Sequence, residues 1–339
     1  MPQGDKIKRP LSLSGTAERP LWVSQMNHFG KENIPFLFIL DFKTISPVII
    51  PLEELDNNII RFSFSHEREE SQGKHPHNNF LYSKYPVDFN VYRKGFQSVL
   101  KAILAGDTYL LNLCYSTKLT GDLDLDKIYT RASAPYKLLV SDRFVVFSPE
   151  SFVSIEDDVI RTFPMKGTVD ASIPDAERIL LDDPKEKEEH ATIVDLLRND
   201  LSMVAKKVGV ARYRYVTEVK AGDRKLLQCS SEITGNLKPG YQAHLGDIFR
   251  ALLPAGSVTG APKKKTVELI EAIEPEPRGF FTGIFGCYDG RGVQSAVMIR
   301  MIEKRNDGFY YRSGGGITYR SDASAEYQEM IDKVYIPTV

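Results

Sequence analysis

Short apolar runs and alternating segments recur along the chain and predict β-strands at many points. Residues Phe36–Phe42 are continuously apolar, as in a strand that is buried on both faces. Residues Ile59–Ser65 alternate between apolar and polar positions, which is typical of a half-buried strand. Further strands are expected near Tyr109–Thr117, Lys137–Val140, Phe144–Phe147, Ile155–Asp158, Val159–Phe163, Phe280–Tyr288, Val293–Glu303 and Gly308–Ser313.

Helical spacing of apolar residues separates these strands. Residues Asn90–Ala105 carry an apolar stripe that ends at Gly106. Other helices are expected over Pro184–Val204, His244–Leu253, Pro262–Ile273 and Ala323–Lys333. Because the strands come in antiparallel-type runs without a regular βαβ repeat, the pattern predicts an α+β fold with large antiparallel sheets flanked by helices.

Two polar stretches interrupt this pattern. Residues 1–20 are expected to be a loosely packed arm, and residues 66–86 a long exposed loop. This loop contains His75 and His77, but its Lys, Pro and Asn residues favour a solvated loop over a metal site. We find no linker sharp enough to separate two independent domains.

Composition and charge exclude several classes of function. The 339 residues are 42% hydrophobic and 26% charged, with a formal net charge of −1, so no broad positive field is available for nucleic acid or an anionic membrane. The N-terminus has no apolar core of a signal peptide, and no apolar run approaches the roughly 20 residues of a membrane span. Three scattered cysteines are typical of reduced core thiols. We therefore expect a cytoplasmic protein.

Two pairs of glutamates stand at helical spacing. Glu186 and Glu189 lie on one face of the helix expected over Pro184–Val204. Glu326 and Glu329 lie on one face of the helix expected over Ala323–Lys333, with Lys333 one turn further. Each pair taken singly is more typical of a solvated helix face. Together the pairs could converge on Mg²⁺, which prefers carboxylates, water and an anionic substrate. The spacing leaves both interpretations open.

Three glycine-containing tracts indicate tight turns or anion binding. They are Pro254–Lys263, which feeds a helix, Ser313–Ile317, and Pro164–Thr168, in which Lys166 precedes a glycine. Backbone amides at such places can bind an anion, although ordinary turns have the same composition. The P-loop spacing GxxxxGK[ST] is absent, so nucleotide hydrolysis lacks its main support.

Seven motifs occur along the chain in the order found in a known family. They are SPESF (148–152), PMKGT (164–168), KEKEEHATIVDLLRNDLSMVA (185–205), PAGSVTGAPKKKTVELI (254–270), GFFTGIFGCYDG (279–290), AVMIR (296–300) and GGGITYRSDASAEYQEMIDK (314–333). In these motifs the chain resembles the chorismate-utilising enzymes. That family includes anthranilate, aminodeoxychorismate, isochorismate and salicylate synthases. The resemblance implies a large α/β sandwich. It also implies that residues 86–339 are a chorismate-binding catalytic domain and that residues 1–85 are a shortened N-terminal part of one compact unit.

The resemblance also implies a magnesium site and a substrate site. Glu189 and Glu329 would be direct Mg²⁺ ligands, and Glu186 and Glu326 would hold coordinated waters. The metal would polarise the ring carboxylate of chorismate. The implied substrate-binding residues are Arg300, Gly314, Gly315, Gly316, Lys333, Thr259 and Phe281.

Lys166 separates the members of the family. Anthranilate- and isochorismate-type relatives typically have alanine here, whereas lysine resembles aminodeoxychorismate synthases, in which it is the proposed nucleophile at ring C2. Glu150 would then be the general acid and Thr168 would orient the reacting groups, and we expect desolvation to lower the pKa of Lys166.

Other positions depart from the relatives. Leu110 stands where hydroxyl-transferring relatives have a lysine, which disfavours isochorismate formation, and Gln228 replaces a histidine of anthranilate-forming relatives. Phe281 stands where tyrosine is frequent, Val169 where arginine is common, and Ala255 replaces a glycine.

The resemblance further implies two partner proteins. A separate glutamine amidotransferase would supply ammonia, because the chain has no glutaminase signature. A pyridoxal-phosphate lyase would act downstream on the product to give 4-aminobenzoate for folate. Two alternatives remain: an anthranilate synthase component I, and a non-catalytic chorismate-binding relative.

Overall fold

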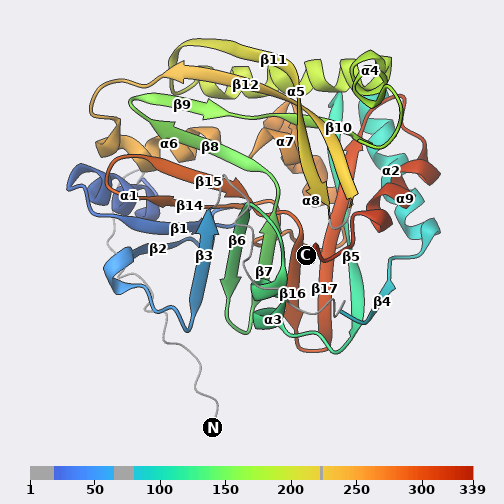
Figure 1. Cartoon of the computed structure of the whole chain (residues 1–339), viewed down its shortest axis with the longest axis horizontal. Helices are drawn as coiled ribbons and strands as arrows, with labels where there is room; N and C mark the ends of the chain where they lie inside the picture. Colours follow the sequence, from blue (N-terminus) through green and yellow to red (C-terminus); the bar gives the residue numbers. More distant parts are fainter. Residues whose placement is uncertain (1–18, 65–79, 222–223, 339) are drawn as a thin grey trace.

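The computed structural model describes residues 19–64, 80–221 and 224–338, which form two large sheets (Figure 1). The first has the order β10 (Met165–Asp170), β12 (Arg224–Asn236), β9 (Val159–Thr162), β8 (Ser151–Glu156), β15 (Val293–Val297), β14 (Ile284–Tyr288), β1 (Phe36–Leu40), β2 (Val48–Pro51), with β11 (Lys206–Ala221) on β12. The second has the order β13 (Gly260–Ala261), β5 (Leu110–Gly121), β17 (Gly308–Ile317), β16 (Met301–Arg305), β7 (Phe144–Ser148), β6 (Tyr136–Val140), β3 (Ile60–Phe64), with β4 (Tyr82–Tyr85) on β5.

Antiparallel pairing joins each pair of neighbouring strands in the described part of the chain. The prediction of an α+β fold with large antiparallel sheets is therefore confirmed. Strands from the N-terminal part belong to both sheets: β1 pairs with β14, and β3 pairs with β6.

Strand β1 shows how the layers are built. All five of its residues are buried, as the continuous apolar run predicts. Phe36, Phe38 and Leu40 pack in a core on the outer side of the first sheet, whereas Leu37 and Ile39 point into the core between the two sheets. Alternate side chains of one strand thus serve two cores, since successive strand residues point to opposite faces.

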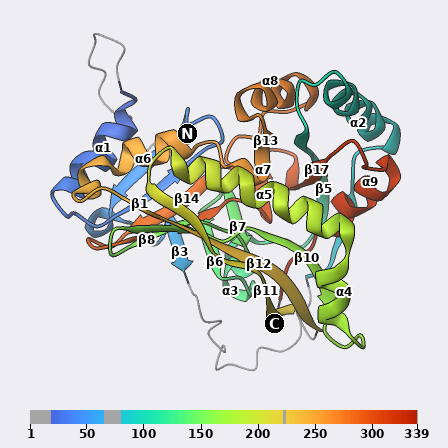
Figure 2. The ribbon, with the colours of Figure 1, turned by 90° about the horizontal axis from the view of Figure 1, so that it is seen from above.

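Helices cover the outer faces of the sandwich. They are α1 (Leu21–Lys31), α2 (Phe89–Leu104), α3 (Leu125–Arg131), α4 (Ala176–Asp182), α5 (Pro184–Ser202), α6 (Leu245–Leu252), α7 (Gly256–Thr259), α8 (Lys263–Ile273) and α9 (Ala323–Asp332), with 3₁₀ turns at Leu52–Glu54 and Tyr241–His244. Figure 2 shows α1, α5 and α6 over the first sheet and α2, α8 and α9 gathered beside β5 and β17. In the described part of the chain, every helix is too short or too polar to cross a membrane.

Side-chain caps fix the starts of the two acidic helices. Asp183 accepts a hydrogen bond from the backbone N–H of Glu186 at 2.9 Å, and Pro184 follows it in the first turn of α5. Asp322 caps α9 in the same way, through the N–H groups of Ser324 and Ala325. Glu186 and Glu326 therefore lie in the first turns of capped helices, and Glu189 and Glu329 lie one turn further along.

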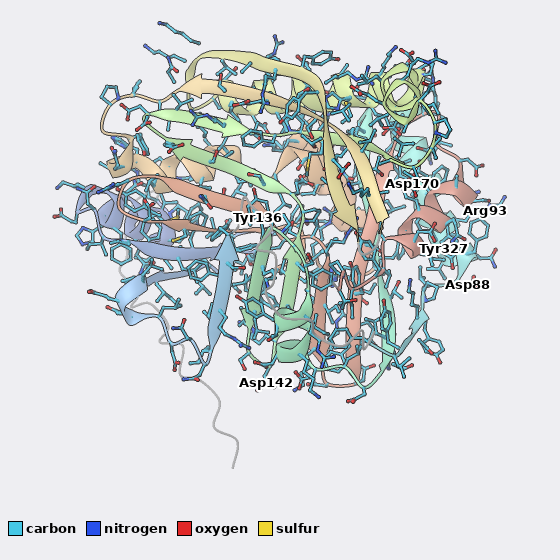
Figure 3. All side chains as sticks on the ribbon, in the orientation of Figure 1. Asp88, Arg93, Tyr136, Asp142, Asp170 and Tyr327 are labelled. Carbon is cyan, nitrogen blue, oxygen red and sulfur yellow. The ribbon has the colours of Figure 1, made fainter. Side chains whose placement is uncertain are left out.

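Contacts with α2 hold helix α9 against the second sheet. The hydroxyl of Tyr327 on α9 donates to the carbonyl oxygen of Val87 at 2.7 Å, and its ring lies 5.2 Å from the ring of Phe89. Figure 3 shows Tyr327 beside Asp88, the residue that caps the start of α2. The early turns of α9 are thereby fixed relative to the start of α2.

The prediction of one strand over Val293–Glu303 is wrong. The chain forms β15 in the first sheet and β16 in the second, and it passes between them at residues 298–300. Arg300 has a φ of +52°, a conformation that L-residues rarely adopt and that turns the chain out of the first strand. The apolar residues continue through this turn because they are buried on both sides of it, so the sequence pattern does not show the break.

Other segments also differ from the predictions. Helix α1 begins directly after the predicted arm, β4 lies inside the predicted 66–86 loop, and the long β11–β12 hairpin was not predicted. His75 and His77 lie outside the described residues. Pro262 is the N-cap residue of α8 instead of a residue in its first turn.

Candidate active site

A cleft of about 830 Å³ lies where parts of both sheets meet the acidic helices. Most residues that the sequence singled out line it: Glu150, Lys166, Thr168, Glu186, Glu189, Phe281, Arg300, Gly314, Gly316, Glu326, Glu329 and Lys333. They come from segments that are far apart in the chain, including β10, α5, β17 and α9. The fold therefore brings both glutamate pairs and Lys166 to one cavity.

A β-bulge presents Lys166 to this cleft. In the pairing of β10 with β12, Lys166 lies opposite Cys229 and Thr168 lies opposite Gln228, so Gly167 is an extra residue. Gly167 has a φ of +76°, and a Cβ atom there would lie 2.9 Å from Oε2 of Glu186. Glycine is needed because it permits both the left-handed backbone and the close approach of helix α5.

The two lysines of the cleft pair with the two glutamates that were predicted to bind metal directly. Nζ of Lys166 lies 3.2 Å from Oε2 of Glu189, and its side chain is 33% exposed. Nζ of Lys333 lies 2.6 Å from Oε1 of Glu329 and donates to the carbonyl oxygen of Gly314 at 2.8 Å. Each acidic helix is thus linked to a strand of the cleft through a lysine.

Gly315 lies beneath helix α9 and does not line the cleft. A Cβ atom at this position would lie 3.1 Å from Oε2 of Glu326 and 3.6 Å from Oε1 of Glu329. The role of the glycine tract at Gly315 is therefore to let the acidic helix approach the strand, while Gly314 and Gly316 face the cleft.

Glu150 lies in a setting that favours its protonated form. Burial raises the pKa of its carboxyl group above the ordinary value, and the hydrogen bond from Ser257 and the charge of Lys166 lower it without cancelling the effect of burial. The hydroxyl of Ser257 donates to Oε1 of Glu150 at 2.6 Å. A carboxyl group with a raised pKa can donate a proton closer to neutral pH.

Arg300 supplies a positive charge at the point where the chain crosses between the sheets. Its guanidinium lies 5.4 Å from the ring centroid of Tyr335, and within the described residues its buried Nε has no hydrogen-bond partner. A buried donor without a partner is costly unless a ligand or water satisfies it. The arrangement suits an anionic group bound in the cleft.

Thr259 is not brought to the cleft. The residue is fully buried, and its hydroxyl donates to the carbonyl oxygen of Ala255 at 2.7 Å within the short helix α7. The expected substrate contact of Thr259 is thus replaced by a local hydrogen bond.

Leu110 lies at the edge of the site. Its Cδ1 would lie 3.0 Å from a Cβ atom on Gly316.

Several residues of the site were missed by sequence reasoning. Asn112, Ser257, Arg312 and Tyr335 also line the cleft, as does Gln228, which was noted only for what it replaces. The serine was visible as part of the Pro254–Lys263 tract. The others had no local signal: Asn112 and Arg312 reach the site through the pairing of β5 with β17, and Tyr335 reaches it on the segment after α9.

Arg278 holds three walls of the cleft together. Its buried guanidinium donates to the carbonyl oxygens of Asn112 at 2.6 Å and Val258 at 2.8 Å, and to the hydroxyl of Thr282 at 3.3 Å. It also pairs with Glu274 at 2.7 Å. This buried ion pair was not anticipated, since neither residue lies in a sequence pattern typical of a site.

The four cleft glutamates suit a hard divalent cation by their chemistry. All have carboxylate oxygens, and all line one cavity. Within the described residues, however, no three His, Cys, Asp or Glu side chains lie close enough together to form a metal cluster. The Mg²⁺ site therefore stays a prediction that rests on donor type and shared cavity.

Comparisons with known proteins identify the family of this chain. Residues 50–338 match the family model described as chorismate binding enzyme. An uncharacterized PabA-like protein of Haemophilus influenzae is 47% identical over 93% of this chain and 96% of its own length. Anthranilate synthase component 1 1 of Haloarcula marismortui is 36% identical over 70% of this chain and 50% of its own length. Aminodeoxychorismate synthase component 1 of Escherichia coli is 32% identical over 72% of this chain and 56% of its own length.

Solved structures show the same fold. A putative 2,3-dihydroxybenzoate-specific isochorismate synthase, DhbC from Bacillus anthracis, matches with a TM-score of 0.69 and 22% identity, covering 92% of this chain and 86% of that one. At this identity the likeness shows the fold alone. The family model that matches residues 50–338 and the 47% identity to the Haemophilus influenzae protein confirm the family resemblance, and the chain belongs to the family of chorismate binding enzymes.

Proposed function

We propose that this chain is the chorismate-aminating component of an aminodeoxychorismate synthase, which replaces the 4-hydroxyl group of chorismate with an amino group. The observation that carries the proposal is the position of Lys166, which lines the cleft and whose amine lies 3.2 Å from Oε2 of Glu189. A lysine in such a place can act as a nucleophile on the conjugated ring once it has lost its proton.

The proposed chemistry needs two groups of the chain. The amine of Lys166 forms a bond to ring C2 while the bond from C4 to its hydroxyl breaks, and Glu150 protonates the departing oxygen so that water leaves. Ammonia then forms a bond to C4 and the C2–lysine bond breaks. The net reaction consumes chorismate and ammonia and releases water. Mg²⁺, when held by Glu189 and Glu329 with Glu186 and Glu326, would withdraw electrons through the ring carboxylate.

Features of the cleft favour amination over the reactions of other family members. The place of the hydroxyl-activating lysine is taken by Leu110, whose aliphatic side chain cannot act as a base. Gln228 lines the cleft where anthranilate-forming relatives are expected to have histidine. Overall identity alone does not separate the two amination reactions, so the case rests on Lys166.

Two partners complete the proposal. A separate glutamine amidotransferase would supply ammonia, as the designation "component 1" of the Escherichia coli relative indicates. A pyridoxal-phosphate lyase would then convert the product to 4-aminobenzoate. In vitro, ammonium should replace the amidotransferase.

Mass spectrometry of products from chorismate, Mg²⁺ and ammonium tests the proposal. We expect the wild type to give an aminated product that retains the enolpyruvyl group, and Lys166→Ala to lower its rate roughly a hundredfold or more. Lys187→Ala is the matched control, because this lysine on α5 pairs with Asp182 at the surface. Release of pyruvate with anthranilate would establish the alternative synthase, and binding of chorismate without turnover would establish a non-catalytic relative.

A further inference from the structure

The C-terminal tail carries a tyrosine into the cleft. Val334 is fully buried and Ile336 packs against the same core, so Tyr335 between them faces the other way and lines the cavity. Beyond it, the carbonyl oxygen of Pro337 accepts a hydrogen bond from the N–H of Ser133 at 2.7 Å. The tail is therefore anchored on both sides of Tyr335.

Tyr335 lies against Arg300. The guanidinium lies over its ring, with Cζ 5.4 Å from the ring centroid, and the phenol is close to the guanidinium. Because arginine has only donors, the phenolic oxygen is the atom that can face the guanidinium, and the phenolic hydrogen is left to donate to another group. The residue is 41% exposed and lines the cleft, so a bound ligand can receive that hydrogen bond.

The charge pattern of the cleft indicates which group of a ligand would accept the hydrogen bond from Tyr335. The four glutamates gather on the α5 and α9 side, where a metal would hold one carboxylate of the substrate. Arg300, with its unpartnered buried Nε, and the Tyr335 phenol present only donors. A pair of donors that includes a guanidinium favours a second carboxylate, since charge-assisted hydrogen bonds are the stronger ones.

We propose that Tyr335 is a substrate-binding residue, which together with Arg300 binds the side-chain carboxylate of an aromatic or cyclohexadiene ether dicarboxylate. This inference rests on the proposed function, which makes chorismate the natural substrate. In chorismate the side-chain carboxylate is the enolpyruvyl carboxylate. Tyr335 selects ligands with two carboxylates over ligands with only the ring carboxylate.

The chain contains a matched control for this contact. Tyr319 and Arg320 form a similar pair, with the guanidinium 5.2 Å from the ring centroid and Nε of Arg320 donating to the phenolic oxygen at 2.6 Å. Tyr319 is exposed and does not line the cleft. Removing its hydroxyl tests the general effect of a lost tyrosine–arginine hydrogen bond.

Binding of two simple probes in the presence of Mg²⁺ tests the inference. The probes are 3-(carboxymethoxy)benzoate, which has both carboxylates, and 3-methoxybenzoate, which has only the ring carboxylate. Calorimetry should show that Tyr335→Phe weakens binding of the first probe roughly tenfold, the effect of one lost hydrogen bond to a charged group, and changes the second by less than about twofold. Tyr319→Phe should change neither.

Kinetics with chorismate give an independent readout. Tyr335→Phe should raise KM roughly tenfold and leave kcat within about twofold, because the contact is made equally in the ground state and the transition state. Equal weakening of both probes would show a structural role and overturn the inference, as would unchanged binding of the dicarboxylate or a wild type that does not bind it. If the dicarboxylate effect appears in a chain that does not aminate chorismate, the proposed function fails and the carboxylate site stands.

Discussion

Removing the hydroxyl of Ser257 should change the pH dependence of the reaction. This hydroxyl donates to Oε1 of Glu150 at 2.6 Å, while the backbone carbonyl of the same residue accepts from Asn112 at 3.2 Å. Ser257→Ala removes only the first contact. Because that contact stabilises the ionised carboxylate, its loss should raise the pKa of Glu150 further, in the same direction as burial.

The size of the shift follows from the strength of the hydrogen bond. Hydrogen bonds to charged groups contribute about 1.5–3 kcal/mol, and one pKa unit corresponds to about 1.4 kcal/mol. The full effect would be about one to two pKa units. Since Glu150 is partly exposed in the cleft and solvent screens the charge, we expect about half of this, roughly one unit or slightly less. A general acid acts in its protonated form, so the alkaline limb of activity should move upward by that amount.

Steady-state kinetics can measure this shift. The kcat/KM for chorismate is determined from neutral to alkaline pH with ammonium, and each value for the variant is divided by the wild-type value at the same pH. The changing fraction of free ammonia cancels in that ratio. Ser257→Thr keeps a hydroxyl and serves as the control. A limb that stays in place, or that moves to lower pH, would refute the assignment of Glu150 as the acid that Ser257 tunes.

Two further substitutions test the architecture of the site by chemical denaturation, each with a control from the same chain. Gly167→Ala should destabilise the fold by about 1–2 kcal/mol because position 167 has a positive φ, and it should also weaken Mg²⁺ binding. Gly209→Ala is the control and should cause no loss of stability, because a Cβ atom there meets open space. Equal effects of the two substitutions would contradict the role given to Gly167 in the bulge. Lys263→Met leaves the buried carboxylate of Asp200 without its partner at 2.9 Å and should cost about 3 kcal/mol, whereas Lys265→Met at the surface should stay within about 0.5 kcal/mol. A small loss for Lys263→Met would show that water replaces the lysine.

Local patterns predicted the elements that have a regular period. The apolar run of β1, the amphipathic stripe of α2 and the two acidic helices lie within a few residues of their expected bounds. The motifs also identified most residues that line the cleft, because the fold brings the segments that carry them together there. These features depend on neighbouring residues, so a single sequence is enough to indicate them.

Long-range features could not be predicted in this way. The β11–β12 hairpin contains several register shifts, which disturb the period of two that identifies a strand. Arg278 reaches the site through carbonyl groups of Asn112 and Val258, contacts that carry no sequence signature. Likewise Tyr335 looks like an ordinary terminal residue until Val334 is known to be buried.

The position of β1 has a consequence for how the chain folds during synthesis. Phe36 pairs with Tyr288, so one partner of this strand is made about 250 residues after it, on the order of tens of seconds later at ordinary translation rates. Until then the segment FLFIL, which ends buried on both faces, has only β2 beside it. Such a strand is prone to pair with other chains, and we expect the nascent protein to depend on chaperones until β14 has left the ribosome.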